Sequence, residues 1–196
     1  MKHSFSIEGY SYFLSPVTTE DAQFIVETRL EDAERNKFIN IISPDVSLQV
    51  KWINKYYEVP DDYYFVVRNK LTNRKEGLIS LYNIKNKKAE WGRWVIKKDS
   101  LASVESFYLI CRMAFEQLDI DEIFSMTIAD NKRVVAFHDS VNAKRIGIIQ
   151  KCFTINNITY DAVKHIVDKE HFSAVIRPKL DKILNLISQR NNKSNI

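Results

Sequence analysis

The sequence predicts an α/β (α+β) fold in which helices flank a mixed, mostly antiparallel central sheet of about seven strands, with an extra helix near the C-terminal end. Short apolar runs bounded by turn residues fill the middle of the chain, which is typical of antiparallel strands. A long amphipathic segment between two such runs indicates a β-α-β unit. The 196 residues are 45% hydrophobic and 28% charged, which suits one domain with a buried core.

The first half of the chain alternates between strands and helices. Pro16 stops the first strand, and Thr18 and Thr19, followed by acidic residues, start a helix. Asp45 or Ser47 starts the next helix. In order, we expect a strand at 10–17, a helix ending near 30, an irregular charged segment at 29–42, a second helix, and strands at 63–67, 77–84 and 89–96.

The second half repeats this alternation within the single domain that we expect over residues 1–196. Asn156 and Asn157 tolerate left-handed backbone and therefore favour a hairpin between two long strands. Pro178 is expected to break or bend the last helix. In order, we expect a helix ending at 118, a strand at 122–129, a helix at 131–141, strands at 145–154 and 158–167, and a C-terminal helix at 169–190.

Charge and composition limit the classes of ligand that the protein is expected to bind and the cell compartment in which it is expected. With 29 basic and 25 acidic residues the net charge is +4, which suits a polyphosphate ligand but does not by itself indicate nucleic acid. Cys111 and Cys152 fall on a predicted helix and strand, which favours reduced, packed thiols. Residues 1–13 lack the apolar core of a signal peptide, and no apolar run reaches about 18 residues. We expect a cytoplasmic protein that binds neither membrane nor nucleic acid.

The segment 97–103 joins the strand at 89–96 to the long helix and has the features of an anion site. The first N–H groups of a helix have no intrahelical partner and lie at the positive end of its dipole. Ser100 and Ser103 add hydroxyl donors, and Lys97 and Lys98 add positive charge. The competing interpretation is an ordinary helix with a serine cap.

This order of elements, with an anion-ready turn before the long helix, resembles the GNAT superfamily of N-acetyltransferases. Three local sequences strengthen the resemblance: Ala-Phe-Glu-Gln-Leu at 114–118, the span from Asp130-Asn131 to His138-Asp139, and Tyr-Asp-Ala-Val at 160–163. The similarity covers about residues 10–172 and is nearest to the branch of ribosomal-protein and nucleotide-amino-sugar acyltransferases. It implies acyl-CoA as co-substrate and no metal.

Two departures from the family pattern concern turns. The family's Arg/Gln-x-x-Gly-x-Gly/Ala phosphate loop is replaced by residues 98–103, Lys-Asp-Ser-Leu-Ala-Ser, so serine hydroxyls would substitute for a glycine-built wrap. The Gly-Phe that usually closes the later helix is Asn142-Ala143 here, and Asn still tolerates a left-handed cap.

The resemblance assigns residues to the acyl-CoA. Backbone groups of Trp94, Val95 and Ile96 would bind the pantetheine arm and the thioester oxygen. Asn131 would cap the next helix and also contact the ligand. The phosphates would lie against the turn and helix start, at Lys98, Ser100, Leu101, Ala102, Ser103 and Val104.

It also implies two catalytic side chains. Glu90 lies where relatives carry a carboxylate base, and a place among Trp91 and Trp94 would suit it to accept a proton. The alternative is a solvated glutamate near lysines at the strand end. His138 lies where relatives place a Tyr or His near the sulfur, and it would protonate the leaving thiolate as imidazole or imidazolium. The alternative is a histidine on the helix surface without a role.

The acceptor is expected to be the amine of a nucleotide-linked amino sugar, in the favoured form a dTDP-amino-dideoxyhexose for surface polysaccharide such as lipopolysaccharide O-antigen. Arginine forks suit diphosphate oxygens, and tyrosine rings suit a base or sugar. The acyl group would be acetyl or a larger one such as 3-hydroxybutyryl. The candidate acceptor residues are Arg29, Arg35, Asn36, Tyr82 and Arg93.

Two other functions stay open at this point. The same fold could acetylate a protein N-terminus, a ribosomal protein or a polyamine, although a polyamine needs an acidic cleft and Asp61-Asp62 is the obvious acidic pair. A non-catalytic binding domain is the alternative from another class, because the loop glycines are missing. A homodimer is compatible with each.

Overall fold

The computed structural model describes residues 2–34 and 36–193 and confirms the predicted fold class. An eight-stranded sheet runs in the order β1-β2-β3-β4-β5-β6-β8-β7, and β5 and β6 are its parallel pair. β1, which the sequence did not predict, has two residues, too few for an apolar pattern. The strands are β1 Ile7–Glu8, β2 Tyr12–Pro16, β3 Tyr63–Asn69, β4 Lys75–Lys85, β5 Lys88–Ile96, β6 Glu122–Ile128, β7 Lys144–Ile155 and β8 Ile158–Asp168.

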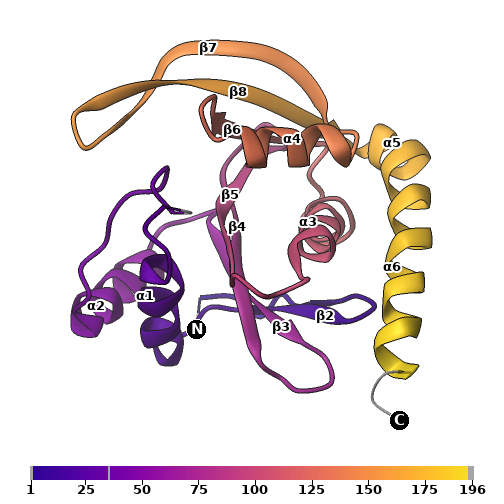
Figure 1. Cartoon of the computed structure of the whole chain (residues 1–196), viewed down its shortest axis with the longest axis horizontal. Helices are drawn as coiled ribbons and strands as arrows, with labels where there is room; N and C mark the ends of the chain where they lie inside the picture. The colour runs from indigo at the N-terminus through magenta and orange to yellow at the C-terminus, as the bar shows by residue number, and fades with distance from the viewer. Residues whose placement is uncertain (1, 35, 194–196) are drawn as a thin grey trace.

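Helices cover both faces of this sheet (Figure 1). α1 and α2 lie on one side of β4 and β5, and α3 lies on the other side with α6 beyond it. No helix in the described part of the chain is long and apolar enough to span a membrane. The helical segments are η1 Thr19–Asp21, α1 Ala22–Leu30, α2 Val46–Tyr56, α3 Ser103–Arg112, η2 Met113–Gln117, α4 Lys132–Ser140, α5 Lys169–His171, η3 Phe172–Ile176 and α6 Arg177–Lys193.

The middle strands are buried on both faces because each contributes to two cores. On β3, Phe65 and Val67 pack toward α3, whereas Tyr64 and Val66 pack toward α1 and α2. Side chains on successive strand residues point to opposite faces, and full burial of one such side chain contributes about 1.5–3 kcal/mol. A ligand can therefore reach the centre of this sheet only where two strands separate.

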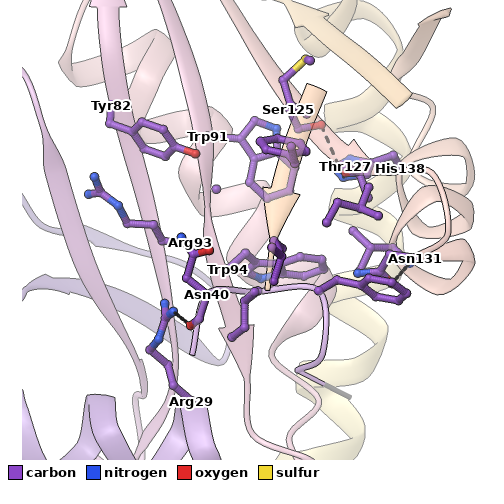
Figure 2. A pocket seen from close by; sticks show the side chains of 18 of the residues that line it. Arg29, Asn40, Tyr82, Trp91, Arg93, Trp94, Ser125, Thr127, Asn131 and His138 are labelled. Carbon is purple, nitrogen blue, oxygen red and sulfur yellow. Dashed lines mark hydrogen bonds between the residues drawn. The ribbon is translucent and has the colours of Figure 1, made fainter. Parts of the chain in front are cut away.

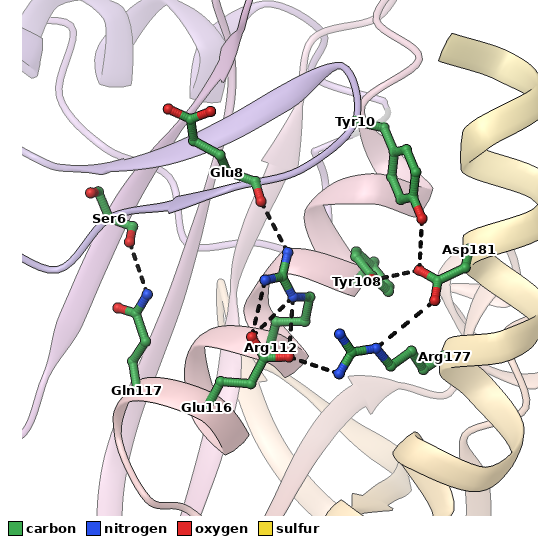
Figure 3. Close-up of polar contacts among 9 residues, drawn as sticks. All are labelled: Ser6, Glu8, Tyr10, Tyr108, Arg112, Glu116, Gln117, Arg177 and Asp181. Atoms are coloured by element: carbon green, nitrogen blue, oxygen red, sulfur yellow. Dashed lines mark hydrogen bonds and ion pairs between the residues drawn. The ribbon is translucent and has the colours of Figure 1, made fainter. Parts of the chain in front are cut away.

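The C-terminal helix is fixed to the rest of the molecule by polar contacts (Figure 3). Asp181 accepts hydrogen bonds from Tyr108 at 2.6 Å and from Tyr10 at 3.0 Å. Arg177 donates to Glu116 at 2.9 Å. These contacts connect α6 to α3, to η2 and to the loop between β1 and β2, far from the carboxyl ends of β5 and β6.

The expected break at Pro178 does not occur. α5, η3 and α6 follow one another without interruption from Lys169 to Lys193. Pro178 is the second residue of α6, and one residue, Arg177, separates it from the π-helical turn η3. A proline near the start of a helical segment removes few hydrogen bonds, and the widened turn before it makes room for its ring.

Candidate active site

The two parallel strands at the centre of the sheet separate along their length. β5 pairs with β6 only from Lys88–Glu90 to Glu122–Phe124, although β5 continues to Ile96 and β6 to Ile128. We call the resulting gap, between residues 91–96 and residues 125–128, the wedge. Backbone groups of β5 that face the wedge have no strand partner, so they are available to a ligand.

A β-bulge in β5 shifts the alternation of side chains along the strand. Leu78 pairs with Val95 and Ser80 with Gly92, so Arg93 and Trp94 together lie opposite a single residue of β4. Arg93 has a φ of 46°, in the left-handed region that non-glycine residues rarely occupy. As a result Arg93 points toward α1 and α2, while Trp94 donates its indole N–H to Ser106 of α3 at 3.0 Å.

The wedge opens into a central cavity of about 350 Å³ that passes through the sheet (Figure 2). Arg29, Asn40 and Tyr82 line it on the α1/α2 face, and Asn131 and His138 line it on the α4 face. Such a passage lets two ligands approach from opposite sides and meet between the strands.

A side cavity of about 300 Å³ adjoins the central cavity at Trp94 and Asn131. The predicted acyl-CoA residues Trp94, Val95, Ile96 and Ser103 line it, and so does Phe137 of α4. A narrow, mostly apolar slot edged by unpaired backbone groups fits a pantetheine arm, which is thin and carries two amides.

The start of α3 offers unsatisfied N–H groups at the end of this slot. The first helical bond of α3 runs from the Ser106 N–H to the Ala102 carbonyl at 2.8 Å, so the N–H groups of residues 103–105 precede it. The N-terminal cap is Ala102, which has no capping side chain, so the serine-capped alternative is wrong. Ser100 instead accepts a hydrogen bond from the Ala102 N–H at 3.2 Å, and Leu101 and Val104 continue the turn.

The mouth of the slot carries mixed charge. The backbone N–H of Lys98 donates to the Glu31 carboxylate at 3.2 Å. Lys98 lines an outer hollow together with Lys132 and Arg133. The acidic residues Asp32, Glu34 and Asp130 line the same hollow. These lysine and arginine side chains suit phosphates, but one N–H of the predicted turn is already engaged.

His138 is buried and neutral. Its side chain is 1% exposed, and its Nε2 lies 3.2 Å from the Thr127 hydroxyl and 3.4 Å from the Ser125 hydroxyl. Burial, with the nearby His165, lowers the pKa of His138 to about 3. The histidine is therefore not on the helix surface, and of the imidazole and imidazolium forms that we expected as proton donor, only the neutral imidazole is present at neutral pH.

Glu90 does not lie among the tryptophans. Trp91 packs toward Phe107 of α3, and as the preceding strand residue Glu90 faces the opposite side. Its carboxylate accepts a hydrogen bond from Tyr82 at 3.0 Å and from the Asn83 amide at 2.8 Å. The expectation of a carboxylate between Trp91 and Trp94 is thus wrong, and Glu90 adjoins the central cavity through Tyr82.

Tyr82, one of the predicted acceptor residues, lies at the central cavity. Burial together with the Glu90 carboxylate raises the pKa of its hydroxyl. Gly92 leaves room for this hydroxyl, because a Cβ at Gly92 would lie 2.6 Å from it. Tyr82 therefore presents a neutral hydroxyl to the cavity.

Arg29 is half-buried, and its guanidinium has no carboxylate partner in the described part of the chain. Its Nη2 donates to the Asn40 carbonyl at 2.6 Å, and its Nε is buried with no partner among the described residues. Burial lowers the pKa of Arg29. A charged, unmatched group on a cavity wall indicates a place for an anion.

Two of the other predicted acceptor residues are engaged in contacts within the protein, and the third is not among the residues that the structure describes. Arg93 makes a bidentate ion pair with Asp62 at 2.6 and 2.8 Å, so its guanidinium is not free to hold a substrate phosphate as we expected. Asn36 lines the side cavity, but its amide donates to the carbonyls of Thr28 and Arg29 at the end of α1. Arg35 lies outside the described residues.

Comparisons with known proteins agree with this geometry. The sequence profile of the Acetyltransferase (GNAT) domain matches residues 12–152. The chain belongs to the GNAT acetyltransferase family. It is accordingly an acyl-CoA-dependent N-acyltransferase, and acyl-CoA is the co-substrate of this GNAT domain. A comparison with curated proteins gives no match.

Solved structures share the fold at low sequence identity. The apo form of FdhC, a nucleotide-linked sugar GNAT, is 22% identical with a TM-score of 0.76, over 91% of this chain and 98% of that chain. A GCN5-related N-acetyltransferase from Brucella melitensis is 17% identical with a TM-score of 0.76, over 96% and 85%. A mutant of the spermidine N-acetyltransferase SpeG from Vibrio cholerae is 15% identical with a TM-score of 0.72, over 84% and 98%.

Several residues of this GNAT site were not predicted from the sequence. Ser125 and Thr127 bring hydroxyls to the central cavity, and Phe38 and Ile39 line both cavities from the irregular segment after α1. Residues 153–155 of β7 line the central cavity as well. The signal for the hydroxyls was visible, since they alternate with apolar residues along β6.

Proposed function

We propose that this GNAT enzyme transfers an acyl group from acyl-CoA to the amine of a nucleotide-linked amino sugar, in the favoured form a dTDP-amino-dideoxyhexose used for surface polysaccharide. The observation that carries the acceptor class is Arg29, a half-buried guanidinium on the α1/α2 wall of the central cavity that has no carboxylate partner among the described residues. Two oxygens of a diphosphate match a guanidinium fork, and they would supply the charge that the protein does not.

Electrostatics separates this acceptor from a polyamine. The α1/α2 side of the central cavity presents Arg29 and Arg93. Among the carboxylates of the described residues near this cavity, Asp62 is paired with Arg93, and Glu90 accepts hydrogen bonds from the neutral groups of Tyr82 and Asn83. A polycation would find only Glu90 without a positively charged partner there and would be repelled by the two guanidinium groups, which opposes its binding.

The proposed chemistry follows from the two faces of the wedge. Unpaired N–H groups of β5 would hold the thioester oxygen as negative charge develops on it. The amine would reach the same carbon from the α1/α2 face, where its proton can pass to the Tyr82 hydroxyl while Tyr82 gives its own proton to Glu90. The C–N bond forms, the C–S bond breaks, the CoA thiolate takes up one proton from water, and Glu90 returns the proton of the amine to the solvent.

The acyl group that we propose is acetyl or a larger, hydroxylated group such as 3-hydroxybutyryl. Ser125 and Thr127 line the cavity where β5 and β6 first separate, next to His138. A hydroxyl on the acyl chain would find hydrogen-bonding partners there, in addition to the contacts that both side chains make with His138 Nε2.

A panel of acceptors tests the proposed function by thiol release from acetyl-CoA and 3-hydroxybutyryl-CoA. It compares dTDP- and UDP-linked amino sugars with the same sugars lacking the nucleotide, with spermidine and with short peptides. We expect the nucleotide-linked amines to show a kcat/KM at least about 100-fold above the free sugars, as the loss of charged hydrogen bonds would give. Turnover confined to spermidine or peptides would overturn the acceptor and leave the GNAT assignment standing.

A further inference from the structure

A further cavity, which we call the rear cavity, lies behind Arg29 on the α1/α2 side of the sheet. This rear cavity has a volume of about 350 Å³ and is lined by residues of α1, α2, β3 and the segment at 40–42. It shares Arg29, Asn40 and Arg93 with the central cavity, so the two cavities meet at the arginine pair. The other lining residues that matter here are Gln49, Trp52 and Tyr64.

We propose that the rear cavity is the nucleobase site of this enzyme, so that an acceptor lies with its base at Trp52, its diphosphate at Arg29 and its amine in the wedge. This inference rests on the proposed function and adds to it the place where the nucleotide is recognised. It predicts that a nucleoside diphosphate binds by itself, without the amino sugar.

Trp52 provides a rigid aromatic surface in this cavity. Its ring stacks on Tyr56 at 5.7 Å with an interplanar angle of 4° and meets the edge of Tyr64 at 6.0 Å. Tyr56 and Tyr64 are 3% and 2% exposed, whereas Trp52 is 40% exposed. The Arg93 guanidinium also lies 5.7 Å from the centre of the Trp52 ring, so a base would stack on the exposed part of a large ring that two buried rings hold in place.

Gln49 provides a polar edge beside this surface. It lies on α2 three residues before Trp52, so both side chains project from the same side of the helix. Gln49 is 9% exposed, and its side-chain amide makes no hydrogen bond within the described residues. An amide offers one acceptor and two donors, which match the N–H and carbonyl groups of a pyrimidine imide.

Arg29 connects the two cavities in the order that a nucleotide sugar requires. Its Nη2 holds the Asn40 carbonyl at 2.6 Å, while its Nε is buried and has no partner among the described residues. An aromatic plane, an amide, an unmatched guanidinium and a catalytic wedge therefore follow one another across the α1/α2 face. A nucleotide sugar presents its base, its diphosphate and its amino sugar in the same spatial order, so each part would meet a protein group that complements it.

The test uses dTDP as probe on the whole protein, by isothermal titration and as an inhibitor of acyl transfer. The variants are Trp52→Leu and Gln49→Leu, with Trp52→Phe as the conservative variant and Lys51→Ala as an exposed control on the same helix. We expect dTDP to compete with the acceptor in the parent protein. Trp52→Leu and Gln49→Leu should each weaken dTDP binding and raise the acceptor KM at least 10-fold, with the KM for acyl-CoA unchanged. Trp52→Phe should recover most of the loss, and Lys51→Ala should lose nothing.

The outcomes separate this inference from the proposed function. If dTDP binds and both Trp52→Leu and Gln49→Leu bind it as tightly as the parent, the base lies elsewhere and the inference is wrong, while the acceptor class stands. If dTDP neither binds nor inhibits and no nucleotide-linked amine is turned over, the proposed function itself is wrong. Should Trp52→Leu fail to fold, Gln49→Leu and Trp52→Phe decide the question.

Discussion

At the scale of single residues, His138 shows how burial changes a role that sequence position suggests. The family resemblance places it near the sulfur, and the structure does place it in the central cavity. There the ring of His138 is buried and uncharged. It contacts the hydroxyls of Ser125 and Thr127 and stacks on His165, with 4.8 Å between the ring centres. We therefore infer that His138 orients the two hydroxyls and does not act as an imidazolium acid.

This role predicts a particular dependence on pH. Since the folded pKa of His138 is about 3, below the ordinary value of 6.5, the ring stays neutral throughout an assay from about pH 5 to pH 9. His138→Gln should lower kcat by less than the roughly 10²-fold expected for loss of a general acid, and plots of log kcat against pH should be parallel for parent and variant. A falling limb above about pH 6.5 that is present in the parent and absent from the variant would show that an imidazolium acts as the acid.

The errors and omissions at this scale have definite causes. Regular strand alternation separates Glu90 from Trp91 but would place it on the face of Trp94. The bulge at residues 93 and 94, which the sequence did not indicate, turns Trp94 to the face of Trp91 and leaves Glu90 on the other face. The partner of Arg93 was not available from the sequence either, because Asp62 precedes β3 and meets Arg93 only once β3, β4 and β5 are in register. Ion pairs between distant segments depend on register, which periodicity does not fix.

At the scale of elements, the β5 bulge and the Arg93–Asp62 pair form one unit. Arg93 adopts a left-handed φ of 46°, and its guanidinium lies 4.5 Å from the centre of the Tyr82 ring while it grips Asp62. The burial of Asp62, which is 6% exposed, makes this pair sensitive to the loss of either partner. The pair keeps the strained residue in place, and thereby the backbone N–H groups on the wedge.

Asp62→Asn should therefore affect both stability and the chemical step. Removing one charge leaves a largely buried guanidinium unmatched, which should lower the free energy of unfolding by about 3 kcal/mol in urea denaturation. Relaxation of the bulge should lower kcat with little change in the KM for acyl-CoA, because the slot at residues 94–96 stays lined. The control is Asp61→Asn at the exposed neighbouring carboxylate, and an equal effect of both substitutions would contradict the role of the pair.

Most elements could be predicted from periodicity and turn residues, including the cap of α2, where the Asp45 side chain accepts from the Ser47 N–H at 2.8 Å. The wedge could not. Residues 89–96 and 122–129 form ordinary strand patterns, and nothing in them indicates that pairing stops at Glu90. That separation depends on the bulge and on the packing of Trp91 and Trp94 toward α3 and α4, which are contacts between distant segments.

At the scale of the whole molecule, the proposed arrangement puts the two substrates on opposite faces of the sheet. Acyl-CoA would occupy the side cavity between β5, α3 and α4, and the acceptor would lie against α1, α2 and β3. The central cavity is the place where the two faces communicate. A change on one face should therefore alter the binding of one substrate and leave the other nearly unchanged.

The measurement that tests this arrangement most directly is the steady-state kinetics of Arg29→Gln with a dTDP-linked amino sugar. The control is Arg74→Gln, at an arginine whose side chain is 73% exposed. Loss of a charged hydrogen bond of about 1.5–3 kcal/mol predicts a rise of about 10- to 100-fold in acceptor KM, with kcat and the KM for acyl-CoA nearly constant. Arg74→Gln should match the parent. An acceptor KM that stays unchanged in Arg29→Gln, or a rise confined to the KM for acyl-CoA, would contradict the account.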